Sequence, residues 1–206
     1  MRNLRMASVR SPFDKLGLAS PAVAALSRAE SMGLLRGQVT CLDYSALEQL
    51  RSGLAEAGIG QGFLAELAQP HACEPDRLST LMARIAEALE QSPAPGHEWP
   101  AVVRVLGIDL LVRLLGISPS SARRYLCGDR TTPDEVAVRL HFLALVVGDL
   151  AGAYNDIGIR RWFDRPRARL GGATPAEALG EEWFPEDPAA RSVRDLASSI
   201  MSSPAT

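Results

Sequence analysis

The apolar residues of this chain recur at helical spacing over most of its length. In the N-terminal part the spacing predicts successive helices that begin near Ser20, Ser45, Phe63 and Pro75. Ser45 and Glu48 stand three residues apart, which is the spacing of a capping box at a helix start. The pattern therefore predicts an all-α fold whose first part is a small helical module.

The helical pattern is interrupted at residues 92–98, SPAPGHE, where closely spaced prolines and a glycine predict a domain boundary. Beyond this break, a helix predicted over residues 133–153 is apolar around most of its circumference. Such a helix needs burial on more than one side, either as the central element that joins two subdomains or in a homodimer core. His141 is expected to be a core or interface residue, because no Ser, Cys or acidic neighbour accompanies it at a useful spacing.

Between the break and this long helix the residues have the order of a helix-turn-helix. A short helix predicted over residues 109–115 is followed by a sharp turn at Gly116 and by a second helix that Ser118 caps. In a helix-turn-helix the second helix presents a polar face to the major groove of DNA. The residues expected to contact DNA are Ser118, Ser120, Ser121, Arg123, Arg124 and Arg130, with Arg139 as a further candidate for a phosphate contact. The pattern alone agrees equally well with a structural helical hairpin.

A second distinctive segment, residues 159–179, reads IRRWFDRPRARLGGATPAEAL. It combines a short amphipathic helix, an arginine-rich turn, a glycine pair and a new helix start. Thr174 and Glu177 have the spacing of a capping box, and Gly171 and Gly172 permit a positive φ or a close approach of the backbone. By themselves these residues describe a well-formed connection between two helices.

Taken together, seven positions of this segment resemble the toxin-binding domain of antitoxins of the Xre/MbcA/ParS type: Trp162, Pro166, Leu170, Gly171, Gly172, Thr174 and Pro175. The resemblance extends upstream to about Trp99, while the residues before it have no counterpart in this family. One departure is Arg167, at a position where the family often has Asn. In such antitoxins a helix-turn-helix precedes a domain that binds a toxin, most often an NAD-consuming enzyme of the RES type.

Together with the break at 92–98, the resemblance implies an N-terminal module of residues 1–95, a helix-turn-helix region of residues 96–153 and a toxin-binding-like domain of residues 154–206. It also implies that a toxin is contacted by Trp162, Arg165, Arg167, Arg169, Gly171, Gly172, Trp183 and Phe184. Trp183 and Phe184 are the expected anchors, since aromatic side chains flanked by charge are frequent binding hot spots. The alternative for both residues is that they pack on the protein's own core.

The composition is that of a folded protein, with 206 residues of which 47% are hydrophobic. No apolar run approaches the length of a membrane span, and the start MRNLRMASVR lacks the apolar core of a secretory signal. The expected location is therefore the cytoplasm. Cys41, Cys73 and Cys127 form no CxxC pair, and His71 beside Cys73 is too little for a metal site. The sequence predicts no metal and no cofactor.

The formal net charge of -2 conceals an uneven distribution. Residues 43–98 are predominantly acidic, whereas residues 99–132 and 158–172 are rich in arginine. Nucleic acid or an acidic partner would bind at the basic segments. Lys15 is the only lysine among 22 basic residues, so the arginine content by itself does not identify a nucleic-acid-binding protein.

The motifs of dinucleotide-binding enzymes, P-loop enzymes, zinc proteases and serine hydrolases are absent from the chain. The sequence therefore predicts a cytoplasmic antitoxin that is not an enzyme. It would act as a homodimer, repress its own promoter by binding double-stranded DNA, and neutralise a cognate toxin. The first alternative is a stand-alone DNA-binding regulator without a toxin partner. The second is a structural adaptor that binds no DNA.

Overall fold

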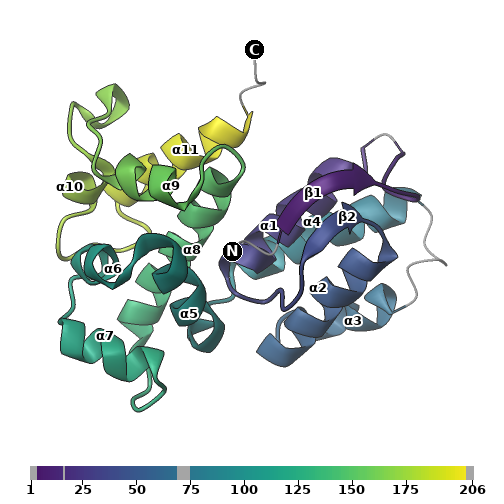
Figure 1. Ribbon diagram of the computed structural model, residues 1–206, viewed down its shortest axis with the longest axis horizontal. Helices are drawn as coiled ribbons and strands as arrows, with labels where there is room; N and C mark the ends of the chain where they lie inside the picture. The colour runs from purple at the N-terminus through teal and green to yellow at the C-terminus, as the bar shows by residue number, and fades with distance from the viewer. Residues whose placement is uncertain (1–3, 16, 69–74, 203–206) are drawn as a thin grey trace. The chain divides into compact units, whose positions relative to one another are not determined.

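The computed structural model describes residues 4–15, 17–68 and 75–202. The protein is mostly helical, with 66% of its residues in helices and 5% in strands, in agreement with the predicted fold class. The chain divides into two compact units, Met1–Ser92 and Pro93–Thr206, and each is described by itself (Figure 1). The division falls inside the proline-containing segment 92–98.

The first unit contains two short strands that the sequence analysis did not predict. β1 (Leu4–Val9) and β2 (Val39–Leu42) form a parallel pair, with Val9 opposite Leu42. Parallel neighbours require a crossover between them, and α1 (Ala19–Ser31) lies in that crossover. Of the strand residues only Val39 and Leu42 are buried, which explains why the apolar pattern of these segments is weak.

The first unit is completed by α2 (Tyr44–Ala57), α3 (Gln61–Leu67) and α4 (Pro75–Glu90). α4 packs against α1, and α2 contacts both α1 and β2. Much of the core between these elements is formed by leucine side chains of α1, α2 and α4. They include Leu26, Leu50, Leu54, Leu78 and Leu89.

The start of α2 differs from its prediction. The N-cap is Asp43, whose carboxylate accepts hydrogen bonds from the backbone N–H groups of Ser45 and Ala46. The predicted capping box of Ser45 and Glu48 is therefore wrong, because an aspartate two residues earlier already satisfies these donors. Glu48 instead accepts hydrogen bonds from Arg51, and these lower the pKa of the Glu48 carboxyl.

The second unit consists of helices joined by short turns. Its first elements are α5 (Pro95–Leu106), α6 (Ile108–Leu115), α7 (Pro119–Leu126) and α8 (Asp134–Ala151). They are followed by α9 (Asp156–Phe163), the 3-10 turn η2 (Ala168–Leu170), α10 (Pro175–Leu179) and α11 (Pro188–Ser202). α5 begins inside the segment 92–98, with Pro95 in its first turn, where proline is well tolerated.

α8 is the central helix of the second unit, and α5, α6, α9 and α11 all pack against it (Figure 1). Almost every residue of α8 from Val136 to Leu150 is buried. The predicted burial on several sides is thus achieved within a single chain. The candidate functional residues lie in α7, which packs against α5 and α6, in α9, which packs against α5 and α8, and in the segment between α9 and α11.

No helix among the described residues combines the length and the apolar character that crossing a membrane requires. Within the same part of the chain, no three His, Cys, Asp or Glu side chains are grouped as metal ligands. His71 and Cys73 lie outside the described residues, whereas Cys41 is half-buried and Cys127 exposed, each with a free thiol.

Candidate functional site

α6 and α7 are joined by a tight turn, and Gly116, Ser118 and Pro119 determine its backbone conformation. Gly116 ends α6 in the left-handed conformation with φ 66°, which glycine adopts without a steric penalty. Ser118 caps α7 by accepting a hydrogen bond of 3.1 Å from the backbone N–H of Ser121. Pro119 occupies the first turn of α7. The helix, the turn and the capped second helix lie where the sequence predicts them.

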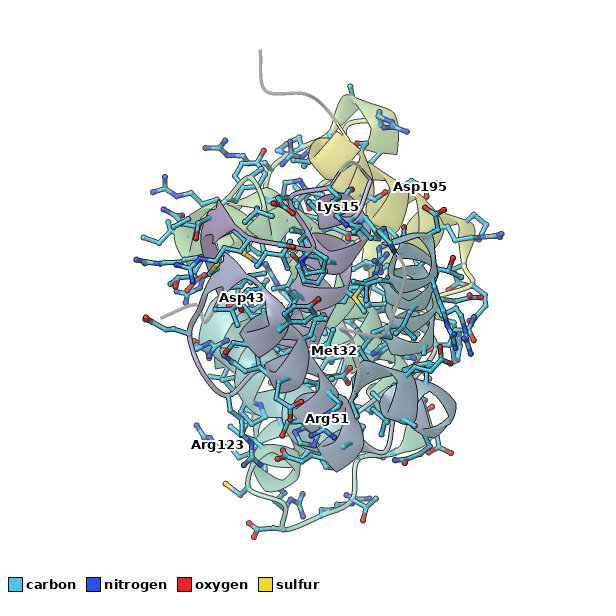
Figure 2. All side chains as sticks on the ribbon, turned by 90° about the vertical axis from the view of Figure 1, so that its right-hand side faces the viewer. Lys15, Met32, Asp43, Arg51, Arg123 and Asp195 are labelled. Atoms are coloured by element: carbon cyan, nitrogen blue, oxygen red, sulfur yellow. The ribbon has the colours of Figure 1, made fainter. Side chains whose placement is uncertain are left out.

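α7 has a buried face and an exposed face. Ala122 and Tyr125 are buried, and the Tyr125 ring lies 5.8 Å from that of Trp99 in α5. Ser118, Ser120, Arg123, Arg124 and Arg130 are exposed, and Ser121 is half-buried. Figure 2 labels Arg123 on this exposed side. Of the residues predicted to contact DNA, the structure thus brings six to one edge of the second unit, on α7 and the turns that flank it.

The carbonyl groups at the end of α6 are all hydrogen-bonded, although the last turn of a helix lacks partners of its own. Gly116 and Ile117 donate their backbone N–H groups to the carbonyls of Arg113 and Val112. The two carbonyls that remain are satisfied by side chains from distant parts of the chain.

Trp183 and Arg139 supply these two donors. Trp183 Nε1 donates to the carbonyl of Leu114 over 2.8 Å, and Arg139 Nη1 donates to the carbonyl of Leu115 over 3.2 Å. Arg139 Nε also donates to the carbonyl of Trp183 over 2.6 Å. A cation at a helix C-terminus also interacts favourably with the helix dipole. The segment that contains Trp183 is therefore attached to the turn between α6 and α7.

Gly116 also contributes to this attachment, because it has no side chain. A Cβ atom built on Gly116 would lie 2.2 Å from the carbonyl oxygen of Glu181, well inside the van der Waals contact distance. Only glycine allows the backbone at Glu181 to pass this close to the turn.

Arg139 is not available to DNA. Its side chain is buried, its guanidinium donates to two backbone carbonyls, and the ring of Phe184 lies 5.3 Å from its central carbon. The predicted phosphate contact of Arg139 is therefore wrong. The residue follows the polar start of α8, but it faces the interior because the C-terminal segment covers that side of the helix.

The turn after α9 has the backbone that its sequence predicts. Gly171 and Gly172 have φ of 67° and 91°. Nothing lies within 4 Å of a Cβ built on either glycine, so the pair serves the positive φ and not a close approach. Thr174 and Glu177 form the predicted capping box, with both hydrogen bonds present. The hydrogen bond from the backbone N–H of Thr174 lowers the pKa of the Glu177 carboxyl.

The side chains expected to contact a toxin are divided between surface and core. Trp162 and Trp183 are 1% and 2% exposed, so in this conformation both belong to the protein's own core. Phe184, in contrast, is 49% exposed. Arg165 and Arg169 are exposed, Arg167 is half-buried, and the guanidinium carbon of Arg167 lies 5.3 Å from the centre of the Trp162 ring.

A pocket of about 260 Å³ opens beside α9. It is lined by Tyr154, Asn155, Ile157, Gly158, Arg161, Trp162, Arg165 and Arg167. Three of these residues, Trp162, Arg165 and Arg167, are predicted from the sequence to bind a partner, whereas the pocket itself has no signal in the sequence. Ile157, with 59% of its surface exposed, lines this pocket as well.

A buried acid–histidine pair also escaped the sequence analysis. Nδ1 of His141 lies 2.6 Å from Oε1 of Glu98, and Glu98 is completely buried. The prediction that His141 is a core residue is confirmed, but its acidic partner lies 43 positions away in α5, where no local spacing indicated it. Neither residue lines the pocket beside α9, so the pair is part of the core between these two helices.

Comparisons of this chain with protein-family models, with curated proteins and with solved structures gave no match. A functional proposal therefore depends on the geometry of the second unit and on the resemblance of the motif in residues 159–179.

Proposed function

We propose that the protein is a DNA-binding antitoxin that represses its own promoter and neutralises a cognate toxin. The observation that carries the DNA-binding part is the exposed edge formed by α7 and its flanking turns, which presents serine hydroxyls at the start of α7, Arg123 and Arg124 in its last turn, and Arg130 beyond its end. Hydroxyl groups and guanidinium groups are suited to DNA phosphates and to base edges.

The charge of this edge supports the proposal. Arg123 and Arg124 make no ion pair or side-chain hydrogen bond with any described residue. The guanidinium carbon of Arg130 lies 5.8 Å from the centre of the Tyr125 ring, and the Arg130 side chain makes no ion pair with another described residue. No carboxylate of the described residues therefore forms an ion pair with these three arginines. A homodimer would place two such edges against the half-sites of a two-fold operator.

The test is a titration of labelled DNA from the region upstream of the protein's own gene. Replacing Arg123 and Arg124 by Ala should weaken binding by at least about tenfold, since one good bidentate base contact contributes about 1 to 3 kcal/mol. The dependence of affinity on salt should also become less steep. The matched control is Arg169→Ala with Arg191→Ala, which removes two exposed arginines from other places in the same unit. Equal loss in both double variants would contradict a specific role for α7.

The proposed toxin-binding surface is the exposed part of the segment after α9. It includes Arg165, Arg169 and Phe184, while Trp162 and Trp183 support it from beneath. An exposed aromatic side chain next to charged residues is a favourable anchor for a protein partner. By resemblance, the partner would be an NAD-consuming toxin of the RES type.

One observation favours the alternative of a stand-alone regulator. Two of the three aromatic residues assigned to the toxin surface are buried, and the buried Trp183 has its own structural task at the end of α6. Under this alternative the protein binds operator DNA and no protein encoded beside it. The two functions differ in whether the product of the adjacent gene co-purifies with the wild-type chain.

A further inference from the structure

We infer that the pocket beside α9 binds a phosphate group, either as free phosphate or as part of a small phosphorylated molecule. This inference does not rest on the proposed antitoxin function, although the pocket shares Trp162, Arg165 and Arg167 with the residues expected to contact a toxin. The pocket combines three arginines, Arg161, Arg165 and Arg167, and contains no Asp or Glu among its lining residues. The carboxylates nearest in sequence, Asp156 and Asp164, do not line it.

The arginines of the pocket differ from their neighbours in how they are paired. Arg113 forms an ion pair with Asp164, and Arg160 donates to the carbonyl of Val105 over 2.6 Å. The side chains of Arg161 and Arg165 make no hydrogen bond or ion pair with another described residue. The pocket therefore concentrates positive charge that no carboxylate of the described residues neutralises.

Two buried donors in the pocket lining also lack an acceptor. They are Nε1 of Trp162 and Nε of Arg167. Buried polar atoms nearly always have a hydrogen-bond partner, so an exception calls for an explanation. In the described part of residues 93–206, no other buried side-chain donor lacks a partner. The Arg167 guanidinium carbon lies 5.3 Å from the centre of the Trp162 ring, so the residues that carry these two donors lie side by side in the pocket lining.

The hydrogen-bond donors of the pocket, mainly the guanidinium groups of its three arginines, are suited to a phosphate group. Guanidinium groups bind phosphate oxygens through paired hydrogen bonds, and several of them balance a doubly charged oxyanion better than a single carboxylate. The size of the pocket agrees with this choice. About 260 Å³ is just below the range of about 300 to 1,000 Å³ of sites for drug-sized ligands, so it accommodates a phosphate with a small body attached.

The test is an NMR titration of the full-length chain with inorganic phosphate at constant ionic strength, which follows the indole N–H signals. Saturable binding should shift the signal of Trp162, because Trp162 lines the site, and should leave those of Trp99 and Trp183 in place. The variant Arg161→Gln with Arg165→Gln should bind phosphate at least about tenfold more weakly, since charge-assisted hydrogen bonds are lost. Arg169→Gln removes an exposed arginine of the same segment that does not line the pocket, and it should bind as the wild type does.

Four results would overturn the inference. The first two are that phosphate does not saturate the wild-type chain, or that it saturates the chain without shifting the Trp162 signal. The other two are that Arg161→Gln with Arg165→Gln binds phosphate as tightly as Arg169→Gln does, or that succinate, a dicarboxylate without phosphorus, binds as tightly as phosphate. Operator titrations of the same variants separate this site from the proposed function. If Arg161→Gln with Arg165→Gln weakens DNA binding while free phosphate does not bind, these arginines contact DNA and the pocket is not a phosphate site.

Discussion

Replacing Gly116 by Ala should destabilise the second unit much more than replacing Gly171 by Ala. The two glycines have almost the same φ, 66° and 67°. The left-handed conformation therefore costs an alanine about 1 to 2 kcal/mol at both places. Their surroundings differ. A Cβ at Gly116 would lie 2.2 Å from the carbonyl oxygen of Glu181, whereas a Cβ at Gly171 meets no atom within 4 Å.

The additional destabilisation expected from Gly116→Ala arises because the new Cβ would clash with a backbone atom, the carbonyl oxygen of Glu181. A backbone carbonyl cannot rotate away as the end of a side chain can, so the chain around Glu181 has to shift. Such overpacking costs about 1 to 3 kcal/mol. The shift also strains the hydrogen bonds of Trp183 to Leu114 and of Arg139 to Trp183, at about 1 kcal/mol for a hydrogen bond. Gly116→Ala should therefore destabilise the unit by about 2 to 4 kcal/mol more than Gly171→Ala.

Tryptophan fluorescence reports on the second unit alone, because Trp99, Trp162 and Trp183 all lie in it and the chain has 3 tryptophans. Urea unfolding of the full-length variants, followed by this signal, gives the free energy of unfolding of that unit. Equal destabilisation by Gly116→Ala and Gly171→Ala would refute the close contact between the turn and Glu181.

Two further predictions concern the corrected cap and the division of the chain. Asp43→Ala should destabilise the first unit by about 1 kcal/mol, as loss of an N-cap does, whereas Ser45→Ala should have little effect. Thermal unfolding followed by circular dichroism checks both variants, and a larger loss from Ser45→Ala would restore Ser45 as the cap. Residues 93–206 expressed alone should be helical and melt cooperatively, since they have a core of their own. An insoluble fragment, or one that melts without cooperativity, would show that the two units fold as one.

The parts of the second unit that the sequence predicts well are those that depend on neighbouring residues. Ser118 and Thr174 each accept a hydrogen bond from a backbone N–H three residues ahead, and Gly116 ends a helix by its own φ. In such motifs the interacting groups belong to one short segment, so the spacing of residue types is sufficient.

The parts that the sequence does not predict depend on residues far apart in the chain. Arg139 bonds to a residue 44 positions away, and Trp183 to one 69 positions away. A helical pattern says that Arg139 lies on a particular side of α8, but it does not say which segment covers that side. For the same reason, no local signal indicated that Trp183 is a core residue while its neighbour Phe184 is exposed.

The strands β1 and β2 escaped prediction for a related reason. Each is short, and together they bury only Val39 and Leu42, so neither shows the alternation typical of a half-buried strand. Their pairing depends on the crossover through α1, which no local pattern reveals.

Neutralisation of the adjacent gene's product tests the central claim most directly, since neither a stand-alone regulator nor a structural adaptor would neutralise a toxin. Cells that express that product should grow when the wild-type chain is co-expressed, and the two proteins should co-purify. Phe184→Ala removes an exposed anchor and should weaken both effects, while leaving operator affinity within a few fold. Val9→Ala is the matched control, because it truncates an exposed apolar side chain outside the second unit. If the wild-type chain neither binds the product nor restores growth, the protein is not an antitoxin, and a stand-alone regulator becomes the better account.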